Sequence, residues 1–266
     1  MKHVVIGNGN LGSAIAVELL ERGQEVTIFS TSNGWRYPTN LQPIYDQIPD
    51  HVWLTVGAGS VEQAKTNYLP FIDLHIKLPV ELAQNLNSRS SLHTFSTDYV
   101  IDRRGKSLYA LSKKTMEEAL ILTNRQNTYI YRIGSLYGAH KPSKCFPYKL
   151  KKNSLKNEPT LPKNLITPTP ADWLAELLID NLEVLPTQTS IFHAAPQGNV
   201  SVKLWGEMIL KKPLMFSGND NDRPAQSNLG CDLPTIKELP TWELPTWLIL
   251  WQEREDYWQD ILSKVE

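Results

Sequence analysis

The sequence predicts an α/β fold: a doubly wound parallel sheet followed by a small C-terminal lobe. Two segments carry this prediction. Residues 4–12 read as a buried strand, a glycine-rich turn and the start of a helix. Residues 95–113 read as a later strand end that leads into a helix. Buried strands that alternate with helices are typical of βαβ units and therefore of a parallel sheet.

Apolar residues define the elements of the first half of the chain. After Gly12 they recur at helical spacing, and Gly23 marks the end of that helix. Short apolar runs predict strands at 1–6, 26–29, 52–56, 92–96 and 129–133, and helices are expected at 70–86 and 109–122. We therefore expect residues 1–140 to form a dinucleotide-binding Rossmann domain.

The composition changes after residue 140 toward lysine, proline and asparagine. Shorter elements are expected there, namely a helix at 171–182, a strand at 190–194 and a helix at 201–210. Residues 141–266 are interpreted as mainly a substrate-binding lobe, some of whose elements can return to the Rossmann core. Near the end, one helical stripe favours core packing or a homodimer contact; its members are Trp247, Leu250, Trp251 and Trp258.

Composition also limits the class of partner. With 266 residues and a net charge of −1, the chain offers no electrostatic reason to expect nucleic acid or a membrane surface, so a small-molecule substrate is expected. No apolar run approaches the roughly 18 residues of a membrane span. Cys145 and Cys231 have neither a metal-binding spacing nor that of a disulfide framework. We expect a cytoplasmic protein without a metal.

The glycine turn predicts a cofactor site. Gly7 suits a tight turn, Gly9 the close approach of a pyrophosphate to the backbone, and Gly12 the packing of helix on strand. The pyrophosphate would sit at the helix N-terminus, where N–H groups and the helix dipole favour anions. The cofactor-binding residues expected here are Gly7, Gly9, Asn10, Leu11 and Gly12. A glycine turn without a ligand is the alternative.

The residues after the second strand bear on the choice of cofactor. NAD-binding versions usually place Asp or Glu there to hold the ribose 2′-hydroxyl. This chain has Ser30, Thr31 and Ser32, followed by Arg36. Small hydroxyls and a guanidinium can bind a 2′-phosphate, so NADP (NADPH) is preferred and NAD stays open. Arg36 could equally be a solvated loop residue.

The strand end and the following helix provide acid/base groups. Tyr109 and Lys113 are four residues apart, so they lie on one helix face, and Thr97 approaches from the strand end. A lysine held beside the phenol, with the cationic nicotinamide nearby, favours the phenolate and brings the tyrosine closer to usable acid/base chemistry at neutral pH. For carbonyl reduction, Tyr109 would donate the proton, Thr97 would hydrogen-bond the carbonyl oxygen, and Lys113 would also hold the nicotinamide ribose. The alternative is a half-buried tyrosine with a surface lysine.

These residues resemble the extended short-chain dehydrogenase/reductase superfamily, and within it the dTDP-4-dehydrorhamnose reductase family. Residues 96–100 look like its strand-end signature, with Thr97 on the catalytic threonine, and Tyr109 and Lys113 fall on the catalytic tyrosine and lysine. Further matches are residues 60–64, Arg132 with 137–138, residues 168–169 with 172–175, and 223–224 with Ser227 and Leu229. The resemblance implies reduction of the 4-keto group of a nucleotide-linked deoxysugar by NAD(P)H.

The sequence departs from this family at four points. The first glycine turn is one residue shorter and looks more like that of β-hydroxyacid or pyrroline-carboxylate reductases. Only eleven residues separate Thr97 from Tyr109, so a substrate-covering loop is trimmed. Ser135 stands where the family commonly has a tryptophan, and His75 where it usually has an asparagine. The last three departures leave the substrate open and the hydride chemistry intact.

Candidate substrate-binding residues follow the catalytic helix. A substrate diphosphate needs cationic or N–H donors, and the lysine-rich run 141–156 and Arg223 offer them. We expect Arg223 and at least one of Lys149, Lys151 and Lys152 to face the same cleft as Tyr109, with Ser135 also near the substrate. A solvated lid is the other reading of the lysines.

Three functions fit this pattern. The first is a carbonyl reductase for a keto-sugar nucleotide or a related small ketone. The others are a non-catalytic NADP-binding regulatory subunit and an imine or aldehyde reductase of a specialised pathway.

Overall fold

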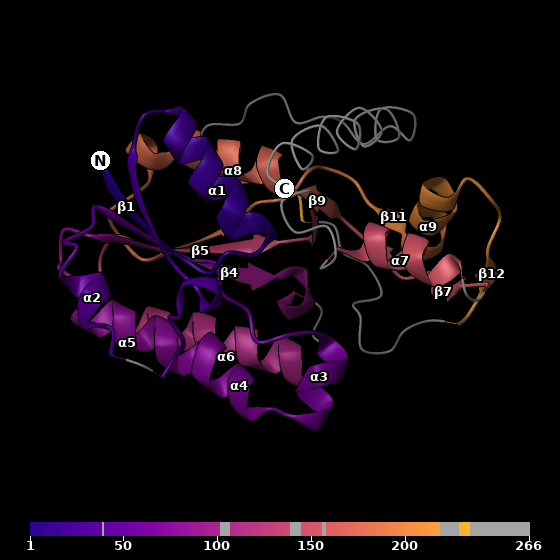
Figure 1. The fold of residues 1–266 in the computed structure, drawn as a ribbon, viewed down its shortest axis with the longest axis horizontal. Coiled ribbons are helices and arrows are strands. Elements are labelled where there is room, and N and C mark those ends of the chain that lie inside the picture. Colours follow the sequence, from indigo (N-terminus) through magenta and orange to yellow (C-terminus); the bar gives the residue numbers. More distant parts are fainter. Residues whose placement is uncertain (39, 102–106, 139–144, 156–157, 219–228, 235–266) are drawn as a thin grey trace.

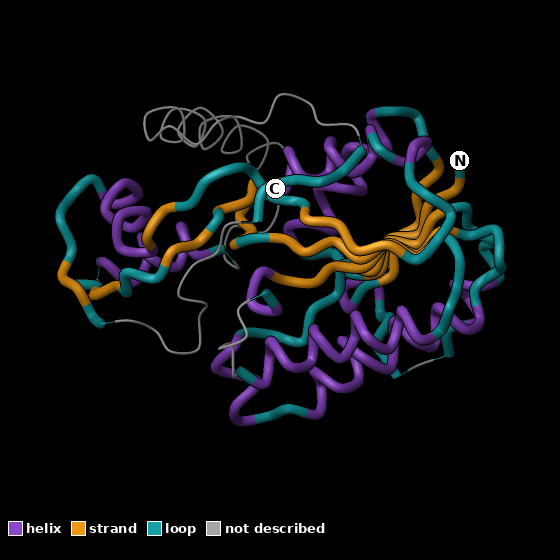
Figure 2. The backbone as a smooth tube through the Cα atoms, turned by 180° about the vertical axis from the view of Figure 1, so that it is seen from behind, coloured by secondary structure: helices purple, strands orange, loops and turns teal. Residues whose placement is uncertain are grey.

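The computed structural model describes residues 1–38, 40–101, 107–138, 145–155, 158–218 and 229–234. Its centre is a six-stranded sheet in the order β10-β5-β4-β3-β1-β2, with every neighbouring pair parallel (Figures 1 and 2). The strands are β1 (Lys2–Ile6), β2 (Glu25–Phe29), β3 (His51–Leu54), β4 (Ser91–Thr97), β5 (Thr128–Ile133) and β10 (Ser190–His193). The predicted doubly wound sheet is confirmed.

The order of the strands reverses beside β1. The chain runs from β1 to β2 on one side and then crosses to β3 on the other side of β1. In doubly wound sheets, ligands bind outside the carboxyl ends of the strands at such a reversal. The loops that follow β1 and β3 are therefore expected to line the ligand crevice.

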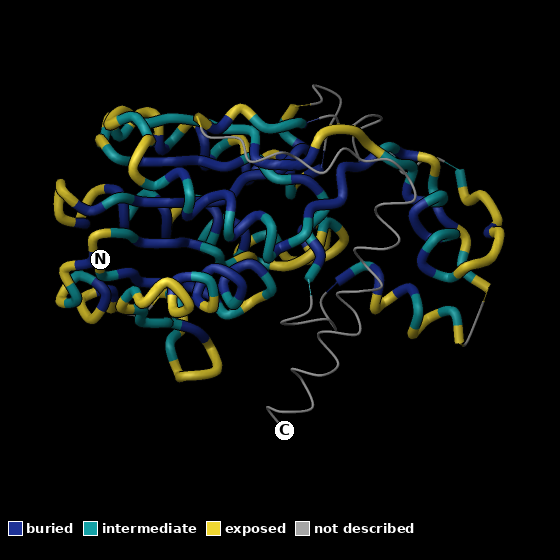
Figure 3. Tube along the Cα trace, turned by 90° about the horizontal axis from the view of Figure 1, so that it is seen from above, coloured by how far each residue is buried: buried dark blue, intermediate teal, exposed yellow. Residues whose placement is uncertain are grey.

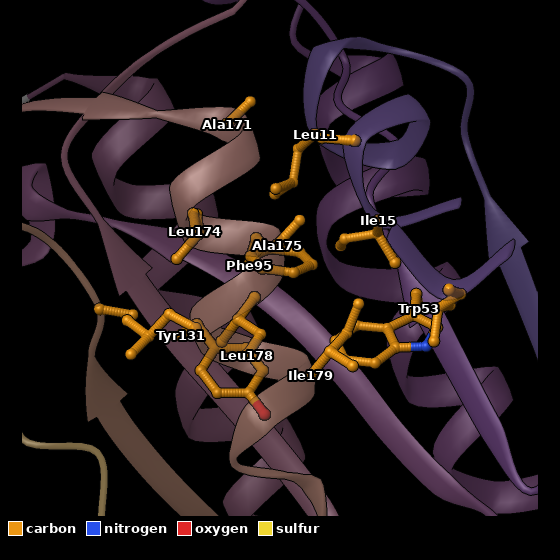
Figure 4. Packing of buried hydrophobic residues seen from close by; sticks show 14 of the residues in the cluster. Leu11, Ile15, Trp53, Phe95, Tyr131, Ala171, Leu174, Ala175, Leu178 and Ile179 are labelled. Atoms are coloured by element: carbon orange, nitrogen blue, oxygen red, sulfur yellow. The ribbon is translucent and has the colours of Figure 1, made fainter. Parts of the chain in front are cut away.

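Helices cover both faces of the sheet (Figure 1). On one face, α1 (Asn10–Glu21) packs against α8 (Ala171–Asp180). Their apolar residues pack with those of the strands, and Figure 4 shows Leu11 and Ile15 of α1 on the side of Ala171 and Ala175 of α8. Because α8 and β10 come from the second half of the chain, that half contributes to the sheet as well as to the lobe.

The other face of the sheet carries α2 (Gln42–Tyr45), α5 (Leu78–Asn85) and α6 (Leu108–Leu122). Shorter elements are α3 (Val61–Thr66) and the 3₁₀ turns η1 (Thr31–Asn33) and η3 (Asp98–Val100). A further 3₁₀ turn, η5 (Leu182–Val184), follows α8 and packs against the cluster on the α1 and α8 face. None of the helices in the described ranges is long and apolar enough to cross a membrane.

A separate lobe lies beyond the carboxyl ends of the strands (Figures 1 and 3). It contains α7 (Phe146–Ser154), α9 (Val202–Leu210) and the short strands β7 (Thr160–Leu161), β8 (Leu165–Ile166), β11 (Val200–Ser201) and β12 (Met215–Phe216). Trp205 and Leu150 belong to its own small core. The link to the sheet includes β6 (Ser135–Tyr137), which pairs with β9 (Pro168–Pro170).

The helix expected at 70–86 contains a π-helical turn. α4 (Leu69–Phe71) leads into the π segment η2 (Ile72–Lys77), which continues into α5. The N–H of Leu78 bonds the carbonyl of Asp73, five residues back. Pro79 explains the local widening, because its ring has no N–H and would clash with the carbonyl of His75 in a regular α-helix. The wider turn includes His75.

Three histidines lie side by side across the sheet, on the face covered by α1 and α8. His3 and His51 stack at 4.9 Å between ring centroids, and His93 stacks on Trp53 at 4.0 Å. Nδ1 of His51 lies 3.0 Å from Nε2 of His93, whose Nδ1 lies 3.0 Å from the hydroxyl of Tyr131. The Trp53 indole N–H donates to Nδ1 of His3 at 3.2 Å.

Burial makes this histidine row sensitive to acid. Desolvation lowers the pKa of His3 to about 4, helped by the charges of His51 and the N-terminus and opposed by Asp50. Desolvation also lowers the pKa of His51 to about 4 and that of His93 well below its usual value. A lowered pKa means that the unfolded chain binds more protons than the folded one between about pH 4 and 6.5. Stability is therefore present above that window and lost as the pH falls through it.

We expect the free energy of unfolding to fall by several kcal/mol between pH 7 and 4.5, since each pKa unit corresponds to about 1.4 kcal/mol. Denaturant titrations at a series of pH values measure this slope. His3→Asn keeps an acceptor for Trp53 but cannot titrate, so its slope should be shallower. Equal slopes for the wild type and His3→Asn would contradict the assignment.

Candidate active site

Two glycines in and after the turn that follows β1 allow the backbone to pack closely against neighbouring residues. Gly7 has a φ of +109°, which favours glycine, and a Cβ there would lie 2.8 Å from the Val56 backbone nitrogen. A Cβ on Gly12 would lie 2.0 Å from the carbonyl oxygen of Gly7. The hydroxyl of Thr55 donates to the carbonyls of Ile6 and Gly7 at 3.1 and 3.0 Å. The loops after β1 and β3 are thus in direct contact.

The same turn leaves the start of α1 open to an anion. Gly9 is the N-cap, no side chain caps the helix, and its first turn has no acidic residue. A Cβ on Gly9 would meet no atom within 4 Å. First-turn N–H groups lack helical partners and favour negative charge. This open, uncapped turn fits the pyrophosphate of a dinucleotide.

The backbone N–H groups of Asn10 and Leu11 lie in the open first turn of α1. The side-chain amide of Asn10 donates to Sγ of Cys145 at 2.7 Å, which ties the turn to the start of α7. The side chain of Leu11 is buried in the core beneath the helix. Their cofactor contacts remain a prediction, and for Leu11, whose side chain is buried, such a contact would come from its main chain.

The residues after β2 form a hydroxyl-bearing turn. The hydroxyls of Ser30 and Ser32 lie 2.7 Å apart, and the backbone N–H of Ser30 donates to the side chain of Asn33 at 2.9 Å. Thr31, Ser32 and Arg36 are exposed. No Asp or Glu occurs between residues 30 and 45. The turn therefore presents donors and no carboxylate.

The end of β4 and the start of α6 meet at the carboxyl edge of the sheet. Thr97 is the last residue of β4, and its hydroxyl donates to Oδ1 of Asp98 at 2.9 Å. The Thr97 side chain also hydrogen-bonds with Tyr109. Ser107 caps α6 by accepting from the Ala110 N–H at 3.1 Å, which places Tyr109 in the first helical turn. The structure thus brings Thr97 and Tyr109 together.

Aromatic rings orient the side chain of Tyr109. Phe71, His75 and Tyr99 each meet its ring edge to face, at centroid distances of 6.3, 5.7 and 5.7 Å. Lys113 lies one turn later, is buried, and donates from Nζ to the carbonyl of Phe95 at 2.7 Å. The alternative of a lysine on the surface is thereby wrong.

The protein's own groups shift the pKa of Tyr109 in the direction opposite to the one expected beside Lys113 and a nicotinamide. Burial first, and then the Asp98 carboxylate, raise the pKa of Tyr109 to about 12, and the Thr97 hydroxyl opposes them. Burial lowers the pKa of Lys113 to about 8, opposed by Glu117. The Lys113 ammonium is directed to a backbone carbonyl. Tyr109 therefore keeps its proton at neutral pH, as a proton donor requires.

Glu117 is a residue that the sequence reasoning missed. It lies four residues after Lys113 on α6 and is buried. Its carboxylate accepts from Nε and NH2 of Arg132 on β5 at 3.0 and 2.7 Å. This two-point ion pair fixes α6 against the sheet. Asp98 was also missed as a neighbour of Tyr109, although its place next to Thr97 was a signal for it.

The described residues include only some of the predicted substrate-binding residues. Ser135 lies on β6, where its N–H donates to the carbonyl of Thr167 at 2.8 Å. Lys149 and Lys152 are exposed on α7, and Lys151 is partly buried. Arg223, Lys141, Lys144, Lys156 and the tryptophan-rich end lie outside the described residues. That Arg223 and one of these lysines face the same cleft as Tyr109 stays a prediction.

No group of three His, Cys, Asp or Glu side chains within the described ranges could hold a metal ion.

The parallel sheet, the glycine turn beside its strand reversal, and the Thr97, Tyr109 and Lys113 arrangement define a Rossmann protein of the short-chain dehydrogenase/reductase type. The model of one protein family, the RmlD substrate binding domain, matches residues 1–231. The chain belongs to this family. The resemblance to the extended reductases and to dTDP-4-dehydrorhamnose reductases is thereby confirmed.

Solved structures share the fold. A dTDP-4-dehydrorhamnose reductase from Clostridium acetobutylicum is 19% identical, with a TM-score of 0.78 over 97% of this chain and 100% of that one. The Bacillus anthracis dTDP-4-dehydrorhamnose reductase, solved with NADP, is 19% identical, with a TM-score of 0.73 over 91% of this chain and 96% of that one. A Thermus thermophilus UDP-glucose 4-epimerase, solved with NAD, is 16% identical, with a TM-score of 0.68 over 86% and 90%. No curated protein matches the chain in sequence.

Proposed function

We propose that this protein is an NADPH-dependent carbonyl reductase of the extended short-chain type. Its substrate would be the keto group of a nucleotide-linked sugar or a related small ketone. The observation that carries the proposal is the placement of Tyr109, beside Thr97 at the carboxyl end of β4 and one turn before the buried Lys113. Family membership and the reductases among the structural neighbours support the same reaction class.

Each residue has a defined part in this reaction. When bound, the nicotinamide supplies a hydride to the carbonyl carbon. Tyr109 gives its phenolic proton to the carbonyl oxygen. The Thr97 hydroxyl, which donates to Asp98 in this structure, would turn its proton to that oxygen and hold it beside the phenol. Lysine has three donors, and Lys113 directs one to the carbonyl of Phe95. The others would hold the nicotinamide ribose.

The cofactor is proposed to be NADP, with NAD as a weaker ligand. The turn at residues 30–36 has three hydroxyls, an exposed guanidinium and no carboxylate that would repel a 2′-phosphate. One neighbour was solved with NADP and others with NAD, so both cofactors fit this fold. The fit of the uncapped α1 turn to a pyrophosphate is common to both.

We expect tighter binding of NADPH than of NADH. Arg36→Ala should raise the dissociation constant of NADPH about tenfold or more, the loss typical of a hydrogen bond to a charged group, and leave that of NADH nearly unchanged. Fluorescence titration of both nucleotides measures this. Arg89→Ala, at an exposed arginine before β4, is the matched control. Equal loss for the two nucleotides would make Arg36 an ordinary loop residue.

A screen of NADPH oxidation tests the function. Nucleotide-linked 4-keto sugars form one arm, and small ketones, aldehydes and cyclic imines form the other, with Tyr109→Phe as the inactive reference. Turnover in the first arm alone identifies a sugar-nucleotide reductase. Turnover in the second alone moves the substrate to a small carbonyl or imine. NADPH binding without turnover in either arm would leave the regulatory role.

A further inference from the structure

His75 connects the loop that borders the cofactor crevice with the helix that carries Tyr109. It lies in the π turn η2, and only 1% of it is exposed. Its Nε2 accepts from the backbone N–H of Ala58 at 3.2 Å. Its Nδ1 lies 2.9 Å from the hydroxyl of Ser112, which donates to the carbonyl of Tyr109 at 2.7 Å.

These contacts define the direction of every hydrogen bond. Because Ala58 donates to Nε2, the ring proton lies on Nδ1 and is donated to Ser112. The Ser112 hydroxyl proton is then left for the carbonyl of Tyr109. The result is one chain of bonds from Ala58 through His75 and Ser112 to Tyr109.

One end of this chain of hydrogen bonds lies in the loop that borders the proposed cofactor crevice, and the other end lies at the proposed acid. Ala58 is in the loop after β3, beside the strand reversal, and that loop contacts the glycine turn through Thr55 and Val56. Tyr109 is the proposed proton donor. The ring of His75 also meets the Tyr109 ring edge to face at 5.7 Å. One side chain therefore contacts both the cofactor border and the acid.

We propose that His75 is a positioning residue that sets the cofactor-bordering loop 57–59 and the Tyr109 helix in one fixed relation. This inference rests on the proposed function for its kinetic consequences, but the bonds themselves do not depend on it. Pro79 makes the position available, because the π turn it imposes includes residue 75.

The positioning does not switch with pH in the working range. Burial and then the charge of Lys113 lower the pKa of His75 to about 2. The charged and titratable groups beside it are Lys113 and Tyr109 on α6. The ring stays neutral, with one donor and one acceptor.

Two substitutions of His75 distinguish its bond with Ala58 from its bond with Ser112. His75→Asn places an amide nitrogen near the Nδ1 position and so keeps a donor for Ser112, but it does not reach Ala58. His75→Gln extends an amide oxygen toward the Nε2 position and keeps an acceptor for Ala58, but it loses the donor to Ser112. Ser112→Ala breaks the same second bond from the other side. Ser90→Ala, at a buried serine whose hydroxyl bonds the carbonyl of Pro49, is the matched control.

We expect His75→Asn to affect mainly NADPH binding, and His75→Gln to affect mainly turnover. His75→Asn should raise the dissociation constant of NADPH about tenfold, and its loss in kcat should be the smaller change. His75→Gln and Ser112→Ala should lower kcat about tenfold and change NADPH binding less. Amide hydrogen exchange should accelerate at residues 55–60 in His75→Asn and at residues 107–113 in His75→Gln.

The outcomes distinguish this inference from the proposed function. Parallel losses in both variants that track thermal stability, or no change in either, would overturn the positioning role. If the wild type reduces no carbonyl, the proposed function fails, and NADPH affinity with the two exchange patterns still decides the role of His75. If the wild type binds no NADPH, the exchange patterns alone decide it.

Discussion

Tyr109→Phe is expected to lower the turnover of a carbonyl substrate by about 10²–10⁴, the range of positioned acid/base catalysis. The substitution removes the phenolic proton but keeps the ring. The ring contacts with Phe71, His75 and Tyr99 therefore persist, and the fold and the affinity for NADPH should change little. Steady-state kinetics with NADPH, together with a nucleotide titration, measure both quantities.

The control for this substitution is Tyr129, which is buried, whereas Tyr109 is partly exposed. Tyr129 lies near the amino end of β5, away from the carboxyl edge of the sheet, and burial also raises its pKa. Tyr129→Phe should leave turnover nearly unchanged. Undiminished reduction by Tyr109→Phe would remove Tyr109 from the chemistry, and Thr97 with its neighbour Asp98 would become the groups to test next.

The sheet was predictable because each of its strands is a short apolar run. The six strands lie at or within a residue or two of the expected ranges. The glycine turn was predictable for a similar reason, since Gly7 and Gly12 satisfy local demands of φ and close packing. The spacing of Tyr109 and Lys113 placed both on α6.

The environment of these groups was not predictable from local sequence. The carbonyl that holds Lys113 belongs to Phe95 on β4, and the carboxylate that raises the pKa of Tyr109 belongs to Asp98. Both depend on how α6 packs on the sheet. Burial and the Asp98 carboxylate raise the pKa of the phenol, which reversed the expected direction. Only the break at Pro79, four residues after His75, was visible in the sequence as a signal for the π turn.

Alanine at Gly12 and at Gly9 should give opposite phenotypes, although both glycines belong to one turn. A Cβ on Gly12 would lie 2.0 Å from the carbonyl oxygen of Gly7 and 2.5 Å from the Thr55 hydroxyl. Backbone must shift to relieve the first contact, and overpacking of this kind typically costs about 1–3 kcal/mol or more. Gly12→Ala should therefore lose thermal stability together with NADPH binding.

A Cβ on Gly9 meets no protein atom within 4 Å, and its φ of −89° suits any residue. Gly9→Ala should therefore unfold at the wild-type temperature. The space that this Cβ enters is the open side of the α1 N-terminus, where the pyrophosphate is proposed to approach the backbone. The dissociation constant of NADPH should rise at least about tenfold, the effect of losing one or two hydrogen bonds to a charged group. Thermal melts and nucleotide titrations of the two variants, side by side, separate the packing role of Gly12 from the binding role of Gly9. A Gly9→Ala protein that binds NADPH like the wild type would place the pyrophosphate elsewhere.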